Sequence, residues 1–375
     1  MTGEKPQGTI KEVRERPGET SGDEKVGVAP VGQRVFSPRN IASFLLTVAV
    51  LYLVYRESLA TDWRGAWASV QGANVALFAL AFAVFYCSFP LRGLRWKVLL
   101  GNVGYDAAVG RPMPSASGLT RIMYVAWFAN CVTVARLGDA YRGYLLKRAA
   151  GVSFAVTLGT ILAERLLDLL VLAAMLGAGV LVVFGGSLPT EATRALAAGL
   201  VLSVIGVVGL LSMRRFRWAF ECILPGRLHA HYSRLEHGVI DSFRRLPLLI
   251  VLSVGGWVLE GAALYFTVAA VTGAPVSVAG ALVVALAASL LTAVPFTPAG
   301  LGFTEAGMIV MLGWLGLDAP TATAVTFLYR VINYWSILVF GFILYLFSHN
   351  MSQPGKQRPE TSLPVQTHKS FIGRS

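Results

Sequence analysis

The chain has 375 residues, of which 55% are hydrophobic and only 14% are charged, and its mean hydropathy is +0.62. This composition excludes an ordinary soluble domain, and the repeated apolar runs behind it indicate a polytopic membrane protein. The formal net charge of +12 would suggest a nucleic-acid partner for a soluble protein, but here lysine and arginine gather in tails and loops between apolar runs. The positive-inside bias and the anionic cytoplasmic leaflet explain this distribution more simply, so we expect no nucleic-acid partner.

The first 39 residues are polar and rich in glycine, glutamate, lysine and proline, which predicts a disordered cytoplasmic tail without a signal peptide. Three cysteines cannot all pair, and two of them lie in apolar runs, so the sequence predicts no disulfide framework, no metal site and no cofactor.

The first half of the membrane domain is expected over about 40–185. Apolar runs cover about 41–55 and 73–90, and the second closes with Pro90-Leu-Arg92-Gly-Leu-Arg95-Trp96-Lys97, a basic and aromatic edge typical of the cytoplasmic interface. The segment 116–136 is only moderately apolar and continues into polar residues, which favours a membrane-dipping hairpin. The run 153–184 would extend roughly 48 Å as a helix, more than the hydrocarbon core of about 30 Å, so it must tilt or overhang.

The second half is expected over about 193–348. An apolar run at about 195–213 precedes the loop 214–246, whose seven arginines place it in the cytoplasm. Four further apolar runs follow, at 247–272, 277–294, 305–317 and 321–348. The run 305–317 is too short to span alone, so with 277–294 and the Pro295-Phe-Thr-Pro298 break it predicts a second hairpin. A basic tail, 349–375, completes the chain, and both termini are predicted to be cytoplasmic.

The two halves repeat one order of elements: two spans, a dipping hairpin with a glycine break, and a span that carries charges. Three spans per half is an odd number, so the second half would enter the bilayer inverted. Gly138 precedes Arg165 by 27 positions, and Gly302 precedes Arg330 by 28. We therefore predict an all-α transmembrane bundle of two inverted repeats with re-entrant hairpins, a pattern that points to a substrate site near the midplane. The alternative is that any six-span chain with glycines can be aligned with itself.

Broken backbone at membrane depth is tolerated where protein buries it or where it lines a wet cavity. Helices expected to begin at Gly138 or Asp139 and near Thr304 would aim two positive N-termini at such a cavity and favour an anion. The candidate substrate-binding residues at these breaks are Arg136, Asp139, Arg142, Thr297, Gly300 and Gly302. Arginine adds forked donors suited to phosphate. Alternatively, Asp139 caps its helix and the arginines extend to lipid headgroups.

A second group of candidates is formed by Glu164, Arg165 and Asp168. Glu164 and Asp168 are four positions apart and share a helical face, while Arg165 and Asp168 are three positions apart. Charges at this depth cost about 3 kcal/mol each, so they should face the interior and pair. In a functional interpretation Arg165 and Arg330, from opposite halves, line a headgroup path with the carboxylates as counter-charges or proton acceptors. The alternative is a structural salt-bridge network. Glu260 and Glu305 are weaker candidates. Glu305 is counted among the substrate-binding residues, and it could also stabilise the helix beginning at Thr304.

These residues resemble a known family, the flippase-like transmembrane region of bacterial lysylphosphatidylglycerol synthases. The matching stretches are Arg92-Gly-Leu-Arg95-Trp96, Arg136-Leu-Gly138-Asp139-Ala-Tyr-Arg142-Gly-Tyr-Leu-Leu-Lys147, Glu164-Arg165-Leu-Leu-Asp168 and Pro298-Ala-Gly300-Leu-Gly302-Phe-Thr-Glu305-Ala. The resemblance covers about 40–348 and implies a lipid-translocating domain in a bacterial plasma membrane, with Arg92 among its substrate-binding residues. The chain departs from the family at Val134, where proline is frequent, and only 27 residues follow the last span, too few for the aminoacyl-transferase domain of the synthases.

Three functions are compatible with these features to different degrees. The leading one is a flippase-like carrier of a phospholipid or lipid-linked headgroup, without enzymatic activity and compatible with a separate lipid-modifying enzyme as partner. A lipid-linked glycosyltransferase is disfavoured because the longest internal loop has 33 residues and the sequence has no Asp-x-Asp motif. A non-transporting scaffold for such an enzyme would tolerate neutral replacement of Arg136, Arg165 and Arg330. The sequence leaves the oligomeric state open.

Overall fold

In the computed structural model of the chain, the described residues are 63–105, 113–133, 137–185, 226–274, 276–292 and 298–350, with single residues between 201 and 212. Every regular element in them is helical. The predicted tails, the run 41–55, most of the run 195–213, and the candidates Arg136 and Thr297 lie outside the described residues.

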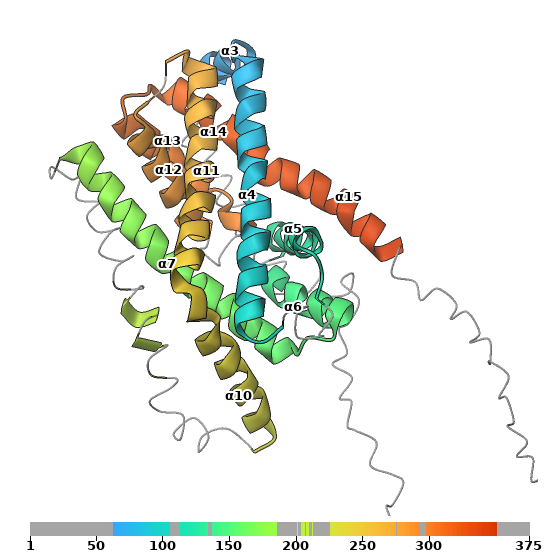
Figure 1. Cartoon of the computed structure of the whole chain (residues 1–375). Helices are drawn as coiled ribbons and strands as arrows, with labels where there is room; N and C mark the ends of the chain where they lie inside the picture. Colours follow the sequence, from blue (N-terminus) through green and yellow to red (C-terminus); the bar gives the residue numbers. More distant parts are fainter. Residues whose placement is uncertain are drawn as a thin grey trace, which may run out of the picture.

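The elements form a bundle around two long central helices (Figure 1). In chain order they are α3 (Trp63–Gln71), α4 (Val75–Asn102), α5 (Ala116–Val132), α6 (Leu137–Ala150), α7 (Phe154–Phe184), α10 (Gly226–Ile240), η3 (Asp241–Arg245), α11 (Leu246–Thr272), α12 (Val278–Leu291), η4 (Pro298–Gly300), α13 (Phe303–Trp314), α14 (Ala319–Arg330), the π-helical turn η5 (Val331–Trp335) and α15 (Ser336–Asn350).

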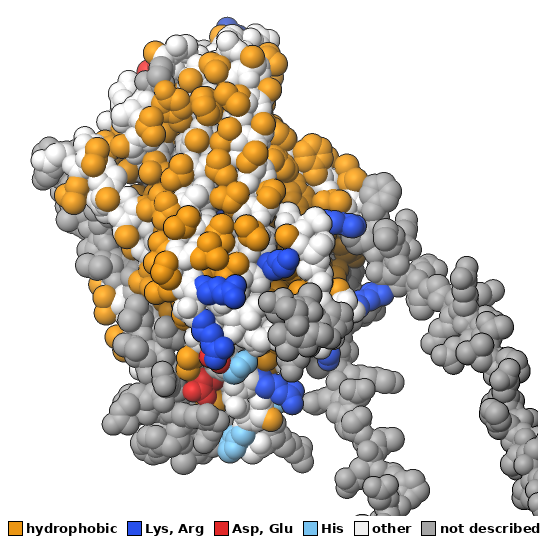
Figure 2. Space-filling model, viewed as in Figure 1, with side chains coloured by type: hydrophobic (Ala, Val, Ile, Leu, Met, Phe, Trp, Pro, Cys, Tyr) orange, Lys and Arg blue, Asp and Glu red, His pale blue; other side chains and the backbone are white. Residues whose placement is uncertain are grey.

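Four helical stretches in the described part are long and apolar enough to cross a membrane. They are Val75–Asn102, Phe154–Val183, His229–Thr272 and Ala319–Leu346, while α12 and α13 are shorter apolar helices. Figure 2 shows hydrophobic side chains over the upper body and lysine, arginine and histidine gathered toward the α10 end. This division agrees with an apolar body in lipid and a charged end in water.

Helices α4 and α11 pack against each other and run antiparallel. Hydrogen bonds join both ends of the pair: Asn74 N donates to Ala270 O at 2.7 Å, and Asn102 Nδ2 donates to Ser242 O at 2.7 Å. Helix α4 begins at Asn74, whose side-chain oxygen accepts from two backbone N–H groups of the first turn. The pair forms the wall from which the polar side chains of the interior project.

Helix α4 continues well beyond the predicted end of its span near residue 90. Pro90 lies inside the helix, which ends only at Asn102. Proline removes one backbone donor, and the continuous packing against α11 retains the helix through it. The basic and aromatic edge expected at the interface is therefore interior: Arg92, Arg95 and Trp96 are all buried.

The other predicted boundaries lie closer to the observed ones. Helix α6 begins at Leu137 and α13 at Phe303, each within two residues of the expected starts. Between α12 and α13 the chain turns through Ala299 and Gly300, with φ angles of 48° and 67°. A Cβ at Gly300 would lie 2.7 Å from the Leu291 carbonyl oxygen, so this turn requires glycine.

Helices α7 and α10 cross with their backbones in contact at two glycines. A Cβ added at Gly159 would lie 2.4 Å from the Leu235 carbonyl oxygen and 2.7 Å from the Gly238 Cα. A Cβ at Gly238 would in turn lie 2.4 Å from the Val156 carbonyl oxygen. The absence of both side chains allows α10 to pack on α7.

We expect Gly159→Ala to lower the free energy of unfolding by about 1–3 kcal/mol, because the added methyl group must displace the α10 backbone. Thermal unfolding in mild detergent measures the effect. Gly177→Ala on the same helix is the matched control, because no atom lies within 4 Å of its Cβ position. That substitution should be neutral or stabilise by up to about 1 kcal/mol through helix propensity. Equal stabilities of the two variants would contradict the proposed contact.

Candidate functional site

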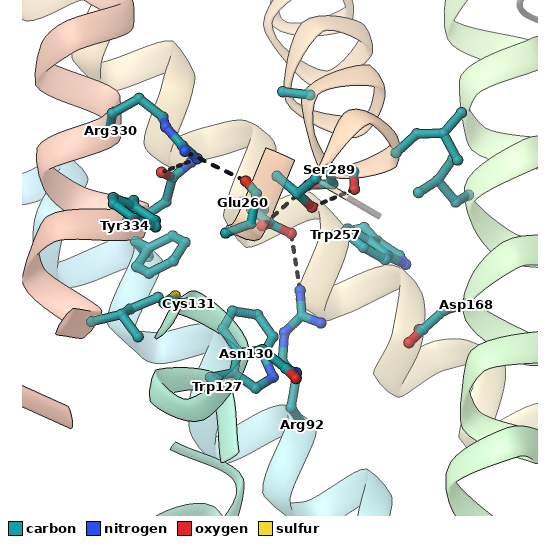
Figure 3. A pocket seen from close by; sticks show the side chains of 18 of the residues that line it. Arg92, Trp127, Asn130, Cys131, Asp168, Trp257, Glu260, Ser289, Arg330 and Tyr334 are labelled. Carbon is teal, nitrogen blue, oxygen red and sulfur yellow. Dashed lines mark hydrogen bonds and ion pairs between the residues drawn. The ribbon is translucent and has the colours of Figure 1, made fainter. Parts of the chain in front are cut away.

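A cavity of about 320 Å³ lies in the interior where α4, α5, α7, α11, α12, α14 and η5 meet. Its charged lining residues are Arg92, Arg165, Asp168, Glu260 and Arg330, several of which Figure 3 shows around one space. Aromatic and aliphatic side chains form the rest of the wall, together with Asn130, Ser289 and Asn333. The cavity therefore combines apolar walls with a few convergent charges, the usual composition of a ligand site.

Arg92 projects from α4 into this cavity between two indole rings. Its guanidinium carbon lies 5.0 Å from the Trp127 ring centroid and 4.9 Å from that of Trp257. Its Nη2 donates to Glu260 Oε2 at 2.9 Å, while its buried Nε has no acceptor among the described residues. Cation–π contacts hold the guanidinium plane without using its N–H groups. The Nε–H group therefore remains available to an anion.

Glu260 lies in the middle of α11 and is 6% exposed. Besides the contact with Arg92, its Oε1 accepts from the Ser289 hydroxyl at 3.3 Å. The Tyr329 hydroxyl donates to its backbone carbonyl oxygen at 3.3 Å, which fixes this turn of α11 against α14. A lone carboxylate within a long apolar run was the signal for this residue, and Arg92 is the partner that its burial requires.

Arg330, the last residue of α14, connects the glycine-containing turn with the cavity. Its Nε donates to Glu305 Oε1 at 2.7 Å, and its guanidinium carbon lies 4.7 Å from the Tyr334 ring centroid. The other oxygen of Glu305 accepts from Gly302 N at 2.7 Å at the start of α13. Glu305 thus caps α13, as expected from the sequence, and also pairs with Arg330.

The π-helical turn η5 directly follows Arg330 and places two more polar side chains at the cavity. Asn333 and Tyr334 both line it, and Arg330 Nη1 lies 3.5 Å from Asn333 Oδ1. Single π-turns inside helices occur frequently at functional sites, because they rotate the following residues relative to an α-helical register.

Arg165, on α7, makes a similar contact in the first half. Its Nη2 and Nε donate to the two carboxylate oxygens of Asp139 at 2.9 Å and 3.1 Å. Asp139 lies in the first turn of α6, as Glu305 lies in the first turn of α13. Arg165 Nη1 is also 4.0 Å from Asp168. In each half, a carboxylate near the start of a helix therefore holds an arginine of a later helix.

Beside the cavity, Arg95 joins α4, α7 and α11. It donates to Asp168, to Glu164 Oε1 at 2.8 Å and to the Ser253 hydroxyl at 2.8 Å. Arg142 lies on the other side of Glu164 and forms an ion pair with its Oε2 at 2.8 Å. These contacts form a compact, buried ion network.

Trp96 packs against that network and does not lie in an interfacial belt. It is fully buried, and the Arg142 guanidinium carbon lies 3.7 Å from its ring centroid. Trp63, Trp67 and Trp314 are exposed, as is usual for tryptophan at a membrane interface.

The structure separates the sequence candidates into groups. The cavity brings together Arg92, Arg165, Asp168 and Arg330. Asp139 and Glu305 do not line it but bind the side chains of Arg165 and Arg330, and Gly300 and Gly302 lie in the turn before α13. Arg142 and Glu164 belong to the buried network and do not line the cavity. Sequence reasoning missed Arg95, Trp127, Trp257 and Ser289 as site residues. A signal for Arg95 was present, because it follows Arg92 by three positions on one helical face.

Comparison with known proteins gives one family and three relatives. The family model described as the lysylphosphatidylglycerol synthase TM region matches residues 40–341. The chain is 32% identical to a UPF0104 membrane protein of Methanocaldococcus jannaschii over 227 residues, which cover 58% of the chain and 93% of that protein. It is 24% identical to a UPF0104 membrane protein of Methanothermobacter thermautotrophicus, covering 73% and 86%.

A third relative is glycosyltransferase AglD of Haloferax volcanii. It is 29% identical over 227 residues, which cover 54% of the chain but only 35% of that protein. All three relatives come from archaea, so a bacterial source stays a prediction. The cytoplasmic location of both termini also stays a prediction.

Proposed function

The chain belongs to the family of the lysylphosphatidylglycerol synthase transmembrane region, and from this membership we propose that it moves the headgroup of a phospholipid or lipid-linked substrate through the interior cavity. The observation that carries the proposal is the convergence of Arg92, Arg165 and Arg330, from three helices, on one cavity inside an apolar body. Charges at this depth are costly and mark substrate paths in membrane proteins.

The chemistry of the cavity fits a phosphate-containing headgroup. Guanidinium groups bind phosphate oxygens with forked, charge-assisted hydrogen bonds. A volume of about 320 Å³ accommodates a small polar group and not two acyl chains. The tails of the substrate would therefore remain in the surrounding lipid while its headgroup crosses the polar interior.

We further propose that two inverted repeats with re-entrant hairpins provide the path. Two observations support this. The central helices α4 and α11, one from each half, run antiparallel. The pairs Asp139–Arg165 and Glu305–Arg330 occupy corresponding places, 26 and 25 positions apart in sequence. Alternating access around such a site is a common mechanism of repeat-built transporters.

The second candidate is a membrane component of a lipid-modifying or glycosyltransferase system, and one observation favours it: a relative is named a glycosyltransferase. In that case the chain would hold a lipid-linked substrate for a transferase located elsewhere. The two candidates differ in whether the purified chain alone moves lipid.

The test is lipid translocation in proteoliposomes that contain acyl-labelled fluorescent phospholipids, followed with a membrane-impermeant quencher. The wild type should expose inner-leaflet lipid to the quencher. Arg92→Gln should slow this at least about tenfold, equivalent to a loss of about 1.4 kcal/mol of interaction with the headgroup. The cause would be the loss of the Arg92 guanidinium. This group lies between two indole rings, and its Nε–H has no acceptor among the described residues.

Arg244→Gln is the matched control, because the side chain of Arg244 is 69% exposed on η3. It should translocate lipid at the wild-type rate. If the wild type moves no lipid across a series of headgroups that includes aminoacylated and glycosylated ones, autonomous translocation is wrong and the component role is favoured.

A further inference from the structure

We propose that Arg92 and Glu260 form an exchangeable ion pair, so that an anionic headgroup takes Arg92 while Glu260 takes a proton from water. Anion binding would then carry one proton into the cavity. This inference rests on the proposed lipid-headgroup function and adds a coupling ion to it.

The first step is the charge balance of the interior. Among the described residues, the ion pairs of the cavity and the adjoining network comprise five arginines and five carboxylates, listed here by pair: Arg92–Glu260, Arg95–Glu164 and Asp168, Arg142–Glu164, Arg165–Asp139 and Arg330–Glu305. These charges cancel. An anion that takes one of these arginines leaves a buried carboxylate without its cationic partner in a medium of low dielectric constant, which is unfavourable unless that carboxylate becomes neutral.

The second step identifies the carboxylate. Asp168 and Glu164 each contact two arginines. Asp139 accepts two hydrogen bonds from Arg165, and Glu305 accepts from both Arg330 and a backbone N–H group. Glu260 differs, because it has one cationic partner and one hydroxyl partner and lines the cavity directly. It loses its one hydrogen bond from a cation if a ligand oxygen takes the Nη2 donor of Arg92.

Arg92 can change its acceptor while its guanidinium stays in place. The rings of Trp127 and Trp257 hold its guanidinium in place whichever anion it contacts. Only one hydrogen bond, from Nη2 at 2.9 Å, connects it to Glu260. Figure 3 shows this bond between the two side chains, with Ser289 on the other side of the carboxylate. A phosphate oxygen can replace this acceptor without moving the arginine from its aromatic walls.

The groups around Glu260 permit a neutral carboxyl group there. A protonated Glu260 can donate to the Ser289 hydroxyl, which can accept or donate. The charged and titratable groups that face it or share the cavity are Arg92 on α4, Cys131 on α5, Arg165 and Asp168 on α7, Tyr329 and Arg330 on α14, and Tyr334 on η5.

The exchange balances in charge and atoms. Before it, Arg92 is a cation paired with the Glu260 anion; afterwards the same cation is paired with the ligand anion, and Glu260 carries one proton supplied by water. The O–H bond of Glu260 forms as one O–H bond of a hydronium ion breaks to leave water, and no other covalent bond changes. Because a proton is bound together with the anion, raising the pH must weaken anion binding.

The experiment measures proton uptake on anion binding to the purified full chain in mild detergent. The probe is a short-chain phosphatidylglycerol below its micelle concentration, titrated by calorimetry in two buffers of different ionisation enthalpy. We expect the wild type to take up about one proton per bound lipid, and its affinity to fall up to about tenfold per pH unit. Glu260→Gln should bind the probe without proton uptake and with an affinity independent of pH.

Two further variants define the assignment. Glu260→Asp retains a titratable group and should retain the uptake, which also tests the proposal if the glutamine variant does not fold. Asp318→Asn is the matched control, because Asp318 is an exposed residue that caps α14 through its side chain. It should behave as the wild type.

The outcomes separate this inference from the proposed function. Lipid binding to the wild type without proton uptake overturns the exchange and leaves the headgroup site intact. No lipid binding at any pH overturns both. Uptake that persists in Glu260→Gln also overturns the exchange. Dimethyl phosphate, a free phosphodiester, is titrated in parallel: uptake with the lipid alone supports exchange by a headgroup, and uptake with both supports exchange by any phosphodiester.

Discussion

Arg95→Leu is expected to lower the free energy of unfolding by about 3–5 kcal/mol. Arg95 is 2% exposed and donates to Glu164, Asp168 and Ser253, which come from two other helices. Its removal leaves two buried carboxylates near each other with reduced compensation, and a buried charge that loses its partner is among the most destabilising changes known. Equilibrium unfolding in mixed detergent measures the loss.

The matched control is Arg244→Leu, which removes an exposed arginine and should change stability by less than about 0.5 kcal/mol. Arg95→Lys should lie between the two variants, because it keeps the charge but cannot bridge two carboxylates with a planar fork. If Arg95→Leu unfolds at the same detergent composition as the control, the three-helix bridge is not an important contact.

The long helices could be predicted from the sequence because length and hydropathy alone determine them. The runs 153–184 and 247–272 correspond closely to α7 and α11. Pro90 was misleading, because a single proline followed by charged residues is the ordinary sign of a helix end. Packing against α11, which is distant in sequence, overrides that local signal in α4. Tertiary contacts of this kind cannot be derived from one helix.

The site was predictable in its members and less so in its pairings. Buried arginines and carboxylates must pair, so Arg165, Asp168 and Arg330 could be selected from charge at depth. Which carboxylate meets which arginine depends on helix packing: Arg92 and Glu260 are 168 positions apart. The indole walls of Arg92 could not be predicted either, because tryptophan in a membrane protein is more often interfacial.

The second large effect is expected for Glu305, whose side chain has two functions at one helix start. Glu305→Ala removes the acceptor for Gly302 N and the partner of Arg330, whose side chain is 4% exposed. We expect a loss of about 2–4 kcal/mol in the free energy of unfolding, since a cap contributes about 0.5–2 kcal/mol and the unpaired arginine the rest. The range lies below that of Arg95→Leu because the Glu305 side chain is 21% exposed and is therefore less completely desolvated.

Three comparisons separate the two functions of Glu305. Asp318→Ala removes a side-chain cap at the start of α14 that forms no ion pair within the described part of the chain, and it should cost about 0.5–2 kcal/mol. Glu305→Gln keeps an acceptor for the backbone and should recover the cap but not the ion pair. The double variant Glu305→Gln/Arg330→Gln should lose less free energy of unfolding than the sum of the losses of the two single variants. The difference should be at least about 1 kcal/mol, because the double variant leaves no charge unpaired. Additive losses would show that Arg330 is held by its other neighbours. The turn before α13 would then be positioned independently of the cavity. The similar placement of the Asp139–Arg165 pair would then not indicate that the two pairs have the same role.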